Sequence, residues 1–254
     1  MQTVTDKLDA VCLAAQIILE SGGETYRAEE TVEKMCQGFD LPKVNVFALP
    51  TGLILTVASE DAPALTRLVR VRNRASNLAR LDQCNHISRQ VAEGKLSARD
   101  ALSQLKALYA LQQSKKTLLV LASALSAGGF TVMLGGLWPD FIISFFCGVV
   151  VQWVQFSADR MKVPALLSGL IAGALTAFMA MLGSVLFPSV QVEPIIAGAI
   201  MPLLPGLATT NGIRDTMRGD LVSGGARIVE AVLCALMLGA GIALVLSLWG
   251  GIQA

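Results

Sequence analysis

The residues best suited to chemistry lie in a polar run that follows an apolar, proline-containing stretch near residue 200. Together they read AIMPLLPGLATTNGIRDTMRGD and span 199–220. The planar guanidinium of Arg214 suits two-point contact with a carboxylate, and the carboxylate of Asp215 suits an ammonium group. A zwitterionic amino acid presents both groups. We therefore predict a substrate path lined by Pro202, Pro205, Gly206, Thr209, Thr210, Asn211, Arg214 and Asp215.

The two prolines break a helix within apolar sequence, where an unpaired backbone group is costly. Neither Pro202 nor Pro205 can donate a hydrogen bond to the carbonyl four residues before it. Membrane proteins tolerate such breaks where the backbone is buried in protein or lines a cavity, and transporters use freed carbonyls and helix ends to bind substrates and ions. The alternative is a kinked helix that ends at a polar loop, with Arg214 and Arg218 serving only as orientation charges.

A second polar face is predicted earlier in the apolar half of the chain. Gln152, Gln155 and Asp159 are three and four residues apart, so a helix places them on one face. Polar side chains deep in a membrane normally face a bundle interior or water, which makes these residues candidates for the same path. The alternatives are a hydrogen bond between helices for Gln152 and a local ion pair of Asp159 with Arg160 or Lys162.

Charge is unevenly distributed along the 254 residues and divides the chain in two. Of the 39 charged residues, 28 lie in 1–116, and the mean hydropathy of the whole chain is +0.60. The net charge of +1 gives no electrostatic support to a nucleic-acid partner. We predict an α-helical membrane protein with five transmembrane helices, in which a small cytoplasmic α+β domain at 1–116 precedes a membrane domain at 117–254.

Five apolar stretches in the second half are long enough to cross a lipid bilayer, which takes about 17–25 residues. They cover about 117–137, 141–157, 164–186, 192–208 and 226–249. One short stretch alone could be a buried helix of a soluble protein, but five in succession favour membrane spans.

Basic residues in the short loops predict the orientation, because they accumulate on the cytoplasmic side of the cell membrane. The loops at 138–140 and 187–191 contain no Lys or Arg. The first half is therefore predicted to be cytoplasmic and the C-terminus external. The residues that set this orientation are Lys115, Lys116, Arg160, Lys162, Arg214, Arg218 and Arg227.

The first half alternates between helical and strand patterns. A helix over 5–21 is predicted from apolar spacing, and a second helix, capped by Thr25, over 25–37. Two strands flank the turn at 50–52, and a third begins at Leu65. Helices follow at 78–91 and 98–113, the latter opened by Ser97 and Asp100. The stripe expected to be buried on the first helix is Leu8, Val11, Cys12, Ala15, Ile18 and Leu19.

Candidate nucleophiles and bases do not combine into a catalytic pattern. Cys84 and His86, the chain's one histidine, are two residues apart on a predicted helix and do not share a face. We interpret them as a half-exposed polar pair. The five cysteines have no C-x-x-C spacing, and we interpret them as reduced, packed residues.

A cluster of acids at the second helix could suggest a metal site. Because Glu30 precedes Lys34 by four residues, we interpret this cluster as a solvated helix face instead. We expect no metal and no cofactor, and the P-loop pattern G-x-x-x-x-G-K-[ST] is missing from the sequence. The acids of the cluster are Glu24, Glu29, Glu30 and Glu33.

Small residues are spaced for close helix packing in two of the predicted spans. Gly169 and Gly173 form a G-x-x-x-G pair, and Ser144 and Gly148 have the same spacing. With an odd number of spans, a pathway built from inverted repeats needs a second half of opposite orientation. The sequence therefore predicts a partner subunit or a second copy of the chain.

Three stretches together resemble the threonine/serine exporter family of the ThrE or YjjP type. They are SGGETYRAEETVEKMCQGFDL, VNVFALPTGLILTV and MPLLPGLATTNGIRDTMRGD, and the similarity runs from about residue 10 to residue 249. The resemblance implies export of small carboxylates, threonine and serine in one branch and succinate in another, driven by an ion gradient. It also implies pairing with a small membrane subunit.

Two other functions stay open from the sequence. The first is export of succinate or a similar dicarboxylate instead of an amino acid. The second is a membrane-anchored domain that binds or hydrolyses a metabolite, a role suggested by the hydrolase-like N-terminal region described for the family. The missing nucleophile–base pair and the five predicted spans argue against this second function.

Overall fold

The computed structural model describes residues 4–59, 62–72, 74–111 and 116–253. The chain folds into two compact units. The first unit contains Met1–Gln113 together with Leu207–Ile228, and the second contains Ser114–Gly206 together with Val229–Ala254. The first unit therefore combines the charged first half of the sequence with the polar run that follows the two prolines.

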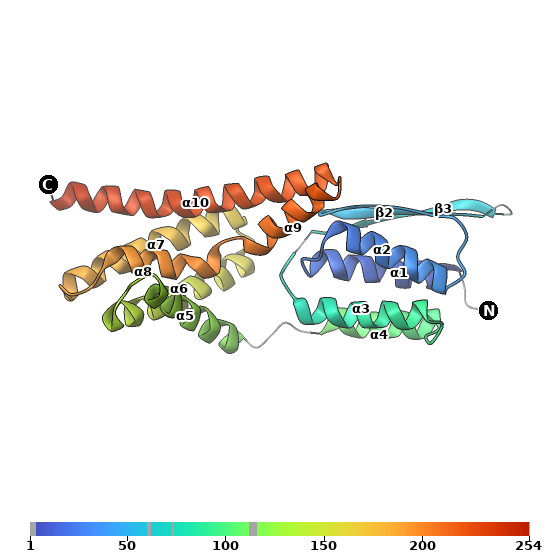
Figure 1. Cartoon of the computed structure of the whole chain (residues 1–254), viewed down its shortest axis with the longest axis horizontal. Coiled ribbons are helices and arrows are strands. Elements are labelled where there is room, and N and C mark those ends of the chain that lie inside the picture. The colour runs from blue at the N-terminus through green and yellow to red at the C-terminus, as the bar shows by residue number, and fades with distance from the viewer. Residues whose placement is uncertain (1–3, 60–61, 73, 112–115, 254) are drawn as a thin grey trace. The chain divides into compact units, whose positions relative to one another are not determined.

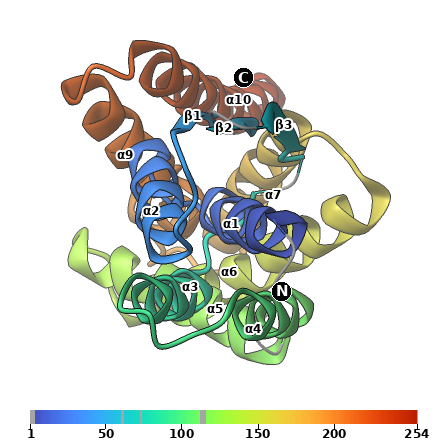
Figure 2. The same ribbon diagram turned by 90° about the vertical axis from the view of Figure 1, so that its right-hand side faces the viewer.

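The N-terminal part of the first unit has three layers. A sheet in the order β1-β2-β3 lies on helices α1 and α2, which lie on α3 and α4 (Figures 1 and 2). The helices are α1 (Val4–Glu20), α2 (Thr25–Gly38), α3 (Leu78–Ala92) and α4 (Ala98–Ala110). The strands are β1 (Val44–Leu49), β2 (Gly52–Ser59) and β3 (Ala62–Arg70), and both pairings are antiparallel.

The sequence-based boundaries agree with these elements to within a few residues. The third strand begins at Ala62, earlier than predicted, and α4 ends at Ala110. The backbone N–H of Asp100 donates to the Ser97 hydroxyl at 3.2 Å, which confirms the predicted cap of α4. The predicted cap of α2 is wrong by one residue, because Glu24 occupies the N-cap position and Thr25 is the first helical residue.

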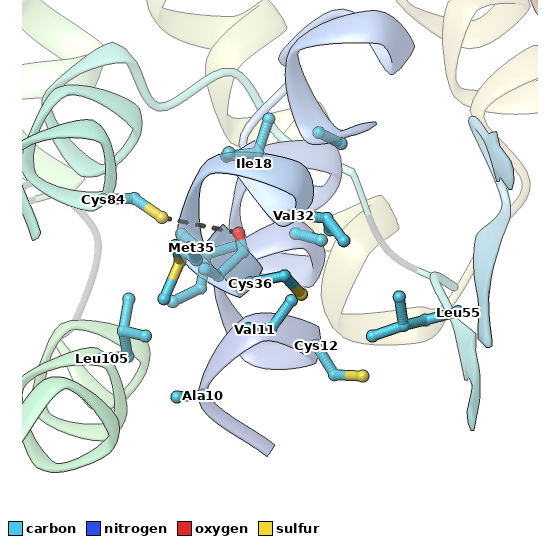
Figure 3. Packing of buried hydrophobic residues seen from close by; sticks show 14 of the residues in the cluster. Ala10, Val11, Cys12, Ile18, Val32, Met35, Cys36, Leu55, Cys84 and Leu105 are labelled. Carbon is cyan, nitrogen blue, oxygen red and sulfur yellow. Dashed lines mark hydrogen bonds between the residues drawn. The ribbon is translucent and has the colours of Figure 1, made fainter. Parts of the chain in front are cut away.

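The core of the first unit forms around α1, because this helix contacts α2, α3, α4 and the sheet. The predicted apolar stripe of α1 is buried throughout, which confirms that prediction. Figure 3 shows side chains from four other elements gathered around it. They are Val32, Met35 and Cys36 of α2, Leu55 of β2, Cys84 of α3 and Leu105 of α4.

The cysteines of this core behave as small apolar residues. The Cys84 thiol donates to the Ala14 carbonyl at 3.4 Å (Figure 3), and burial raises the pKa of this thiol to about 12. Burial likewise raises the pKa of Cys36 to about 12. All five cysteines are free; four are buried, as predicted for packed residues, and Cys234 is half-buried. The interpretation of Cys84 and His86 as a half-exposed pair is wrong for Cys84, which is fully buried, whereas His86 is exposed.

The second unit is a bundle of apolar helices. Among the described residues of the chain, four helices have the length and composition to cross a membrane: α5, α6, α7 and α10. A fifth candidate span is broken: α8 and a short 3₁₀ turn belong to the second unit, and α9, which follows them, belongs to the first. The bounds are α5 (Lys116–Met133), α6 (Trp138–Met161), α7 (Ala165–Leu186), α8 (Val192–Ile200), η1 (Met201–Leu203), α9 (Gly206–Met217) and α10 (Leu221–Gln253).

Small residues let the helices of the second unit approach closely, as the sequence predicted. A Cβ atom added at Gly148 on α6 would lie 2.7 Å from the Cα atom of Ala124 on α5. One added at Gly173 on α7 would overlap the Leu238 carbonyl of α10. Both predicted small-residue faces are therefore helix contacts and not lipid-facing surfaces.

Candidate functional site

The predicted break between the fourth span and the polar run is confirmed. Helix α8 ends at Ile200, the 3₁₀ turn follows, and α9 begins at Gly206. Pro202 and Pro205 cannot donate to the carbonyls of Gly198 and Met201, but nearby backbone N–H groups do. The Met201 N–H donates to the Gly198 carbonyl, and the Leu204 N–H donates to the Met201 carbonyl at 3.3 Å. We therefore do not assign these carbonyls to substrate.

Helix α9 folds back on the start of α10 through two glycines. The chain turns at Gly219, whose φ of 93° lies in the left-handed region. A Cβ atom added at Gly224 on α10 would lie 2.7 Å from the Gly212 carbonyl of α9. Only glycine allows this approach, and the close contact of the two helices brings Asp215 beside Arg227.

Asp215 and Arg227 form a buried ion pair. Asp215 is 0% exposed and Arg227 is 4% exposed. Asp215 Oδ2 lies 3.2 Å from Arg227 Nε, and an Arg227 Nη2 hydrogen donates to the Gly23 carbonyl at 2.8 Å. Removing both charges from water is costly, so each charge depends on the other. From the sequence, Arg227 was interpreted only as a charge that sets the membrane orientation, and its contact with Asp215 was not predicted.

Backbone carbonyls of the loop between α1 and α2 accept hydrogen bonds from side chains of α9 and α10. Gly22 has a φ of 82°, and a Cβ atom added at Gly23 would lie 2.6 Å from the Ile18 side chain, so both positions require glycine. The Asn211 side chain, which is buried, donates to the Gly22 carbonyl at 2.7 Å. Two adjacent carbonyls of this loop thus accept hydrogen bonds from residues that lie 189 and 204 positions later in the chain.

The same loop supplies a carboxylate to Arg214. Arg214 Nη1 donates to Glu24 Oε1, and Arg27 Nη1 lies 3.5 Å from the second carboxylate oxygen. The Glu24 side chain is 6% exposed, whereas that of Arg214 is 51% exposed. The prediction of a solvated acidic face is therefore wrong for Glu24. It is confirmed for Glu30, which is exposed and lies 2.6 Å from Lys34 Nζ.

Other charged side chains make contacts close to the pair of Arg214 and Glu24. The Arg218 guanidinium stacks on the Tyr26 ring, with 3.7 Å to the centroid. Glu29 accepts the Ala48 N–H at 2.8 Å. Burial raises the pKa of Glu29, the Ala48 N–H partly offsets this, and the nearby carboxylates of Asp220, Glu33 and Asp215 add to the increase.

These residues define what we call the loop–α9 site. Its members are Gly22, Gly23, Glu24, Asn211, Arg214, Asp215 and Arg227. Sequence reasoning selected Asn211, Arg214 and Asp215 but missed the partners of all three. The adjacent glycines before Glu24 were a local signal, because glycine adopts backbone conformations in turns that other residues rarely adopt. In chemical terms, the site already holds a carboxylate against a half-exposed guanidinium.

The remaining candidates lie elsewhere on these elements. Thr209 and Thr210 are exposed on α9, Pro202 is exposed in η1, and Pro205 is half-buried just before Gly206. Gln152, Gln155 and Asp159 belong to α6 of the second unit. The two glutamines are half-buried and Asp159 is exposed. These residues stay candidates for a substrate path.

Four long apolar helices and a fifth, broken candidate span, all among the described residues, are typical of a multi-pass membrane protein. The model of the family described as "Putative threonine/serine exporter" (ThrE) matches residues 9–249. The chain belongs to this family of exporters. No solved structure matches the chain.

Named relatives cover nearly the whole chain at low identity. A "Probable succinate transporter subunit YjjP" from Klebsiella aerogenes is 26% identical over 245 residues, covering 93% of this chain and 91% of the relative. The protein of that name from Escherichia coli is 24% identical, covering 92% and 91%. A "Probable threonine/serine exporter" from Mycobacterium tuberculosis is 23% identical, covering 96% of this chain but only 46% of the relative.

Proposed function

We propose that this chain is a subunit of a secondary transporter that exports small amino acids, threonine and serine, across the cytoplasmic membrane. The observation that supports this most directly is the contact of Arg214 with a carboxylate. Its guanidinium is half exposed, so a carboxylate arriving from solvent can reach it. Glu24 occupies the position on the Arg214 guanidinium that a substrate carboxylate would take.

The alternative substrate is succinate or a similar dicarboxylate, because the relatives carry both names. A guanidinium recognises a carboxylate in either substrate. The second group of the substrate would decide between them, an ammonium or another carboxylate. Asp215 already has Arg227 as its partner, so we assign Asp215 to positioning α9 rather than to the ammonium group.

The partner that we propose is a small membrane subunit of the same exporter family. Two relatives of nearly the same length are named transporter subunits, and the exporter from Mycobacterium tuberculosis is about twice as long as this chain. A second half supplied by another chain would complete the pathway. Assembly of two copies of this chain is the alternative arrangement.

We further propose that residues 1–116 and the loop between α9 and α10 lie in the cytoplasm and that the C-terminus is external. The basic loop residues support this orientation. So does the contact of Asn211 with Gly22, because it requires Asn211 and the loop between α1 and α2 to lie on the same side of the membrane. Reporter fusions after residue 113 and after residue 254 test it. A periplasmic-type reporter that is active at residue 113 would overturn the assignment.

An efflux assay tests the function and resolves the substrate. Cells that lack the system would be preloaded with labelled threonine or labelled succinate and would express this chain together with a small membrane subunit of the same exporter family. We expect rapid efflux of threonine with both subunits and background efflux with either subunit alone. Succinate efflux without threonine efflux would identify the dicarboxylate alternative, and background efflux of both substrates would contradict the proposal.

A further inference from the structure

An apolar groove with two cations at one end runs between α5 and α6 of the second unit. Its volume is about 660 Å³, within the range of small-molecule sites. The residues that line it are Lys116, Thr117, Val120, Leu121 and Ala124 of α5, and Phe145, Val149, Trp153, Phe156, Ser157 and Arg160 of α6.

The two helices are antiparallel, which places both cations at the same end of the groove. Lys116 Nζ lies 5.5 Å from the centroid of the Phe156 ring, and farther along the helices the Ser123 hydroxyl donates to the Gly148 carbonyl at 3.1 Å. The first residue of α5 therefore lies beside the last turns of α6, where Arg160 is found.

The groove remains open along its length in this chain. Leu121 is 49% exposed and Trp153 is 62% exposed, although both belong to membrane-spanning helices. Its floor is closed by the contact of Gly148 with Ala124. A ligand that fits this surface must be apolar along most of its length and must carry negative charge at one end.

We propose that this groove binds an anionic phospholipid. An acyl chain lies along the apolar walls, and the phosphate lies between Lys116 and Arg160. Basic pockets between membrane helices bind anionic headgroups in this way. Long basic side chains reach the interface while their stems stay on apolar surface. A zwitterionic lipid offers the same acyl chains but no net negative charge to the two cations.

Trp153 provides a direct test because it lines the groove. In a variant that keeps only this tryptophan (Trp138→Phe, Trp249→Phe), the full chain would be reconstituted in phosphatidylcholine vesicles. Increasing fractions of dibrominated phosphatidylglycerol or dibrominated phosphatidylcholine would be added, because bromine quenches indole fluorescence on contact. With about a fivefold preference per basic residue, we expect phosphatidylglycerol to be favoured about 25-fold.

Charge variants separate a specific site from general lipid contact. Lys116→Gln with Arg160→Gln should abolish the preference for phosphatidylglycerol, and both residues are exposed, so folding should not suffer. Lys162→Asn is the matched control, because it removes a charge at the same end outside the groove and asparagine tolerates the φ of 55° found there. It should keep the preference. Equal quenching by both lipids, or a preference that survives the double replacement, would refute the site. Absence of quenching would mean that protein covers the groove and would also refute it.

Discussion

Arg227→Met is expected to destabilise the first unit by about 3–5 kcal/mol, because the buried carboxylate of Asp215 loses its cation. The variant also loses the hydrogen bond to the Gly23 carbonyl. Pulse proteolysis of the full chain in mild detergent, over a urea series, measures the loss. With a urea dependence of about 1–3 kcal/mol per molar, the midpoint should fall by at least about 1 M.

The double variant Asp215→Leu with Arg227→Met decides whether the pair itself causes this loss. Replacing a buried ion pair by apolar groups is often neutral, so most of the stability should return. Arg99→Met on the exposed face of α4 is the control and should leave the midpoint unchanged. The single variant Asp215→Leu completes the cycle. If the effects of the two single replacements simply added in the double variant, the two residues would not be coupled as the structure indicates.

Arg214→Lys is expected to reduce efflux at low substrate concentration by about tenfold, since lysine keeps the charge but lacks the planar fork that holds a carboxylate at two points. Glu24→Gln is expected to act in the opposite direction. It removes the internal carboxylate that competes with substrate, and it should raise efflux at low substrate concentration by up to about fivefold, because one partner is half exposed.

These opposite signs separate substrate binding from a purely structural role. If the pair of Arg214 with Glu24 only holds α9 to the loop, both replacements should lower efflux and membrane abundance together. Glu30→Gln is the matched control, because it is the same chemical change on the same helix at an exposed ion pair. Efflux should be compared at equal membrane abundance, with threonine and succinate measured in parallel.

Properties that depend on neighbouring residues in the chain could be predicted from the sequence. Apolar runs of about 20 residues predicted the membrane helices because the bilayer sets their length. The prolines at 202 and 205 predicted the break before α9, because a proline in a helix interior removes an N–H donor and crowds the preceding turn. The alternation of apolar residues predicted the strands, and helical spacing predicted the buried face of α1.

Only the tertiary structure decided how the polar residues pair. Arg214 and Glu24 are 190 positions apart, and Arg227 and Gly23 are 204 positions apart. No periodic pattern connects positions so distant, so the sequence assigned Glu24 to a solvated face and Arg227 to a loop. In the structure both residues are buried and paired, because a charge removed from water needs a partner of opposite charge. The sequence thus determined which segments are helical and apolar, whereas the fold determined which carboxylate each arginine holds.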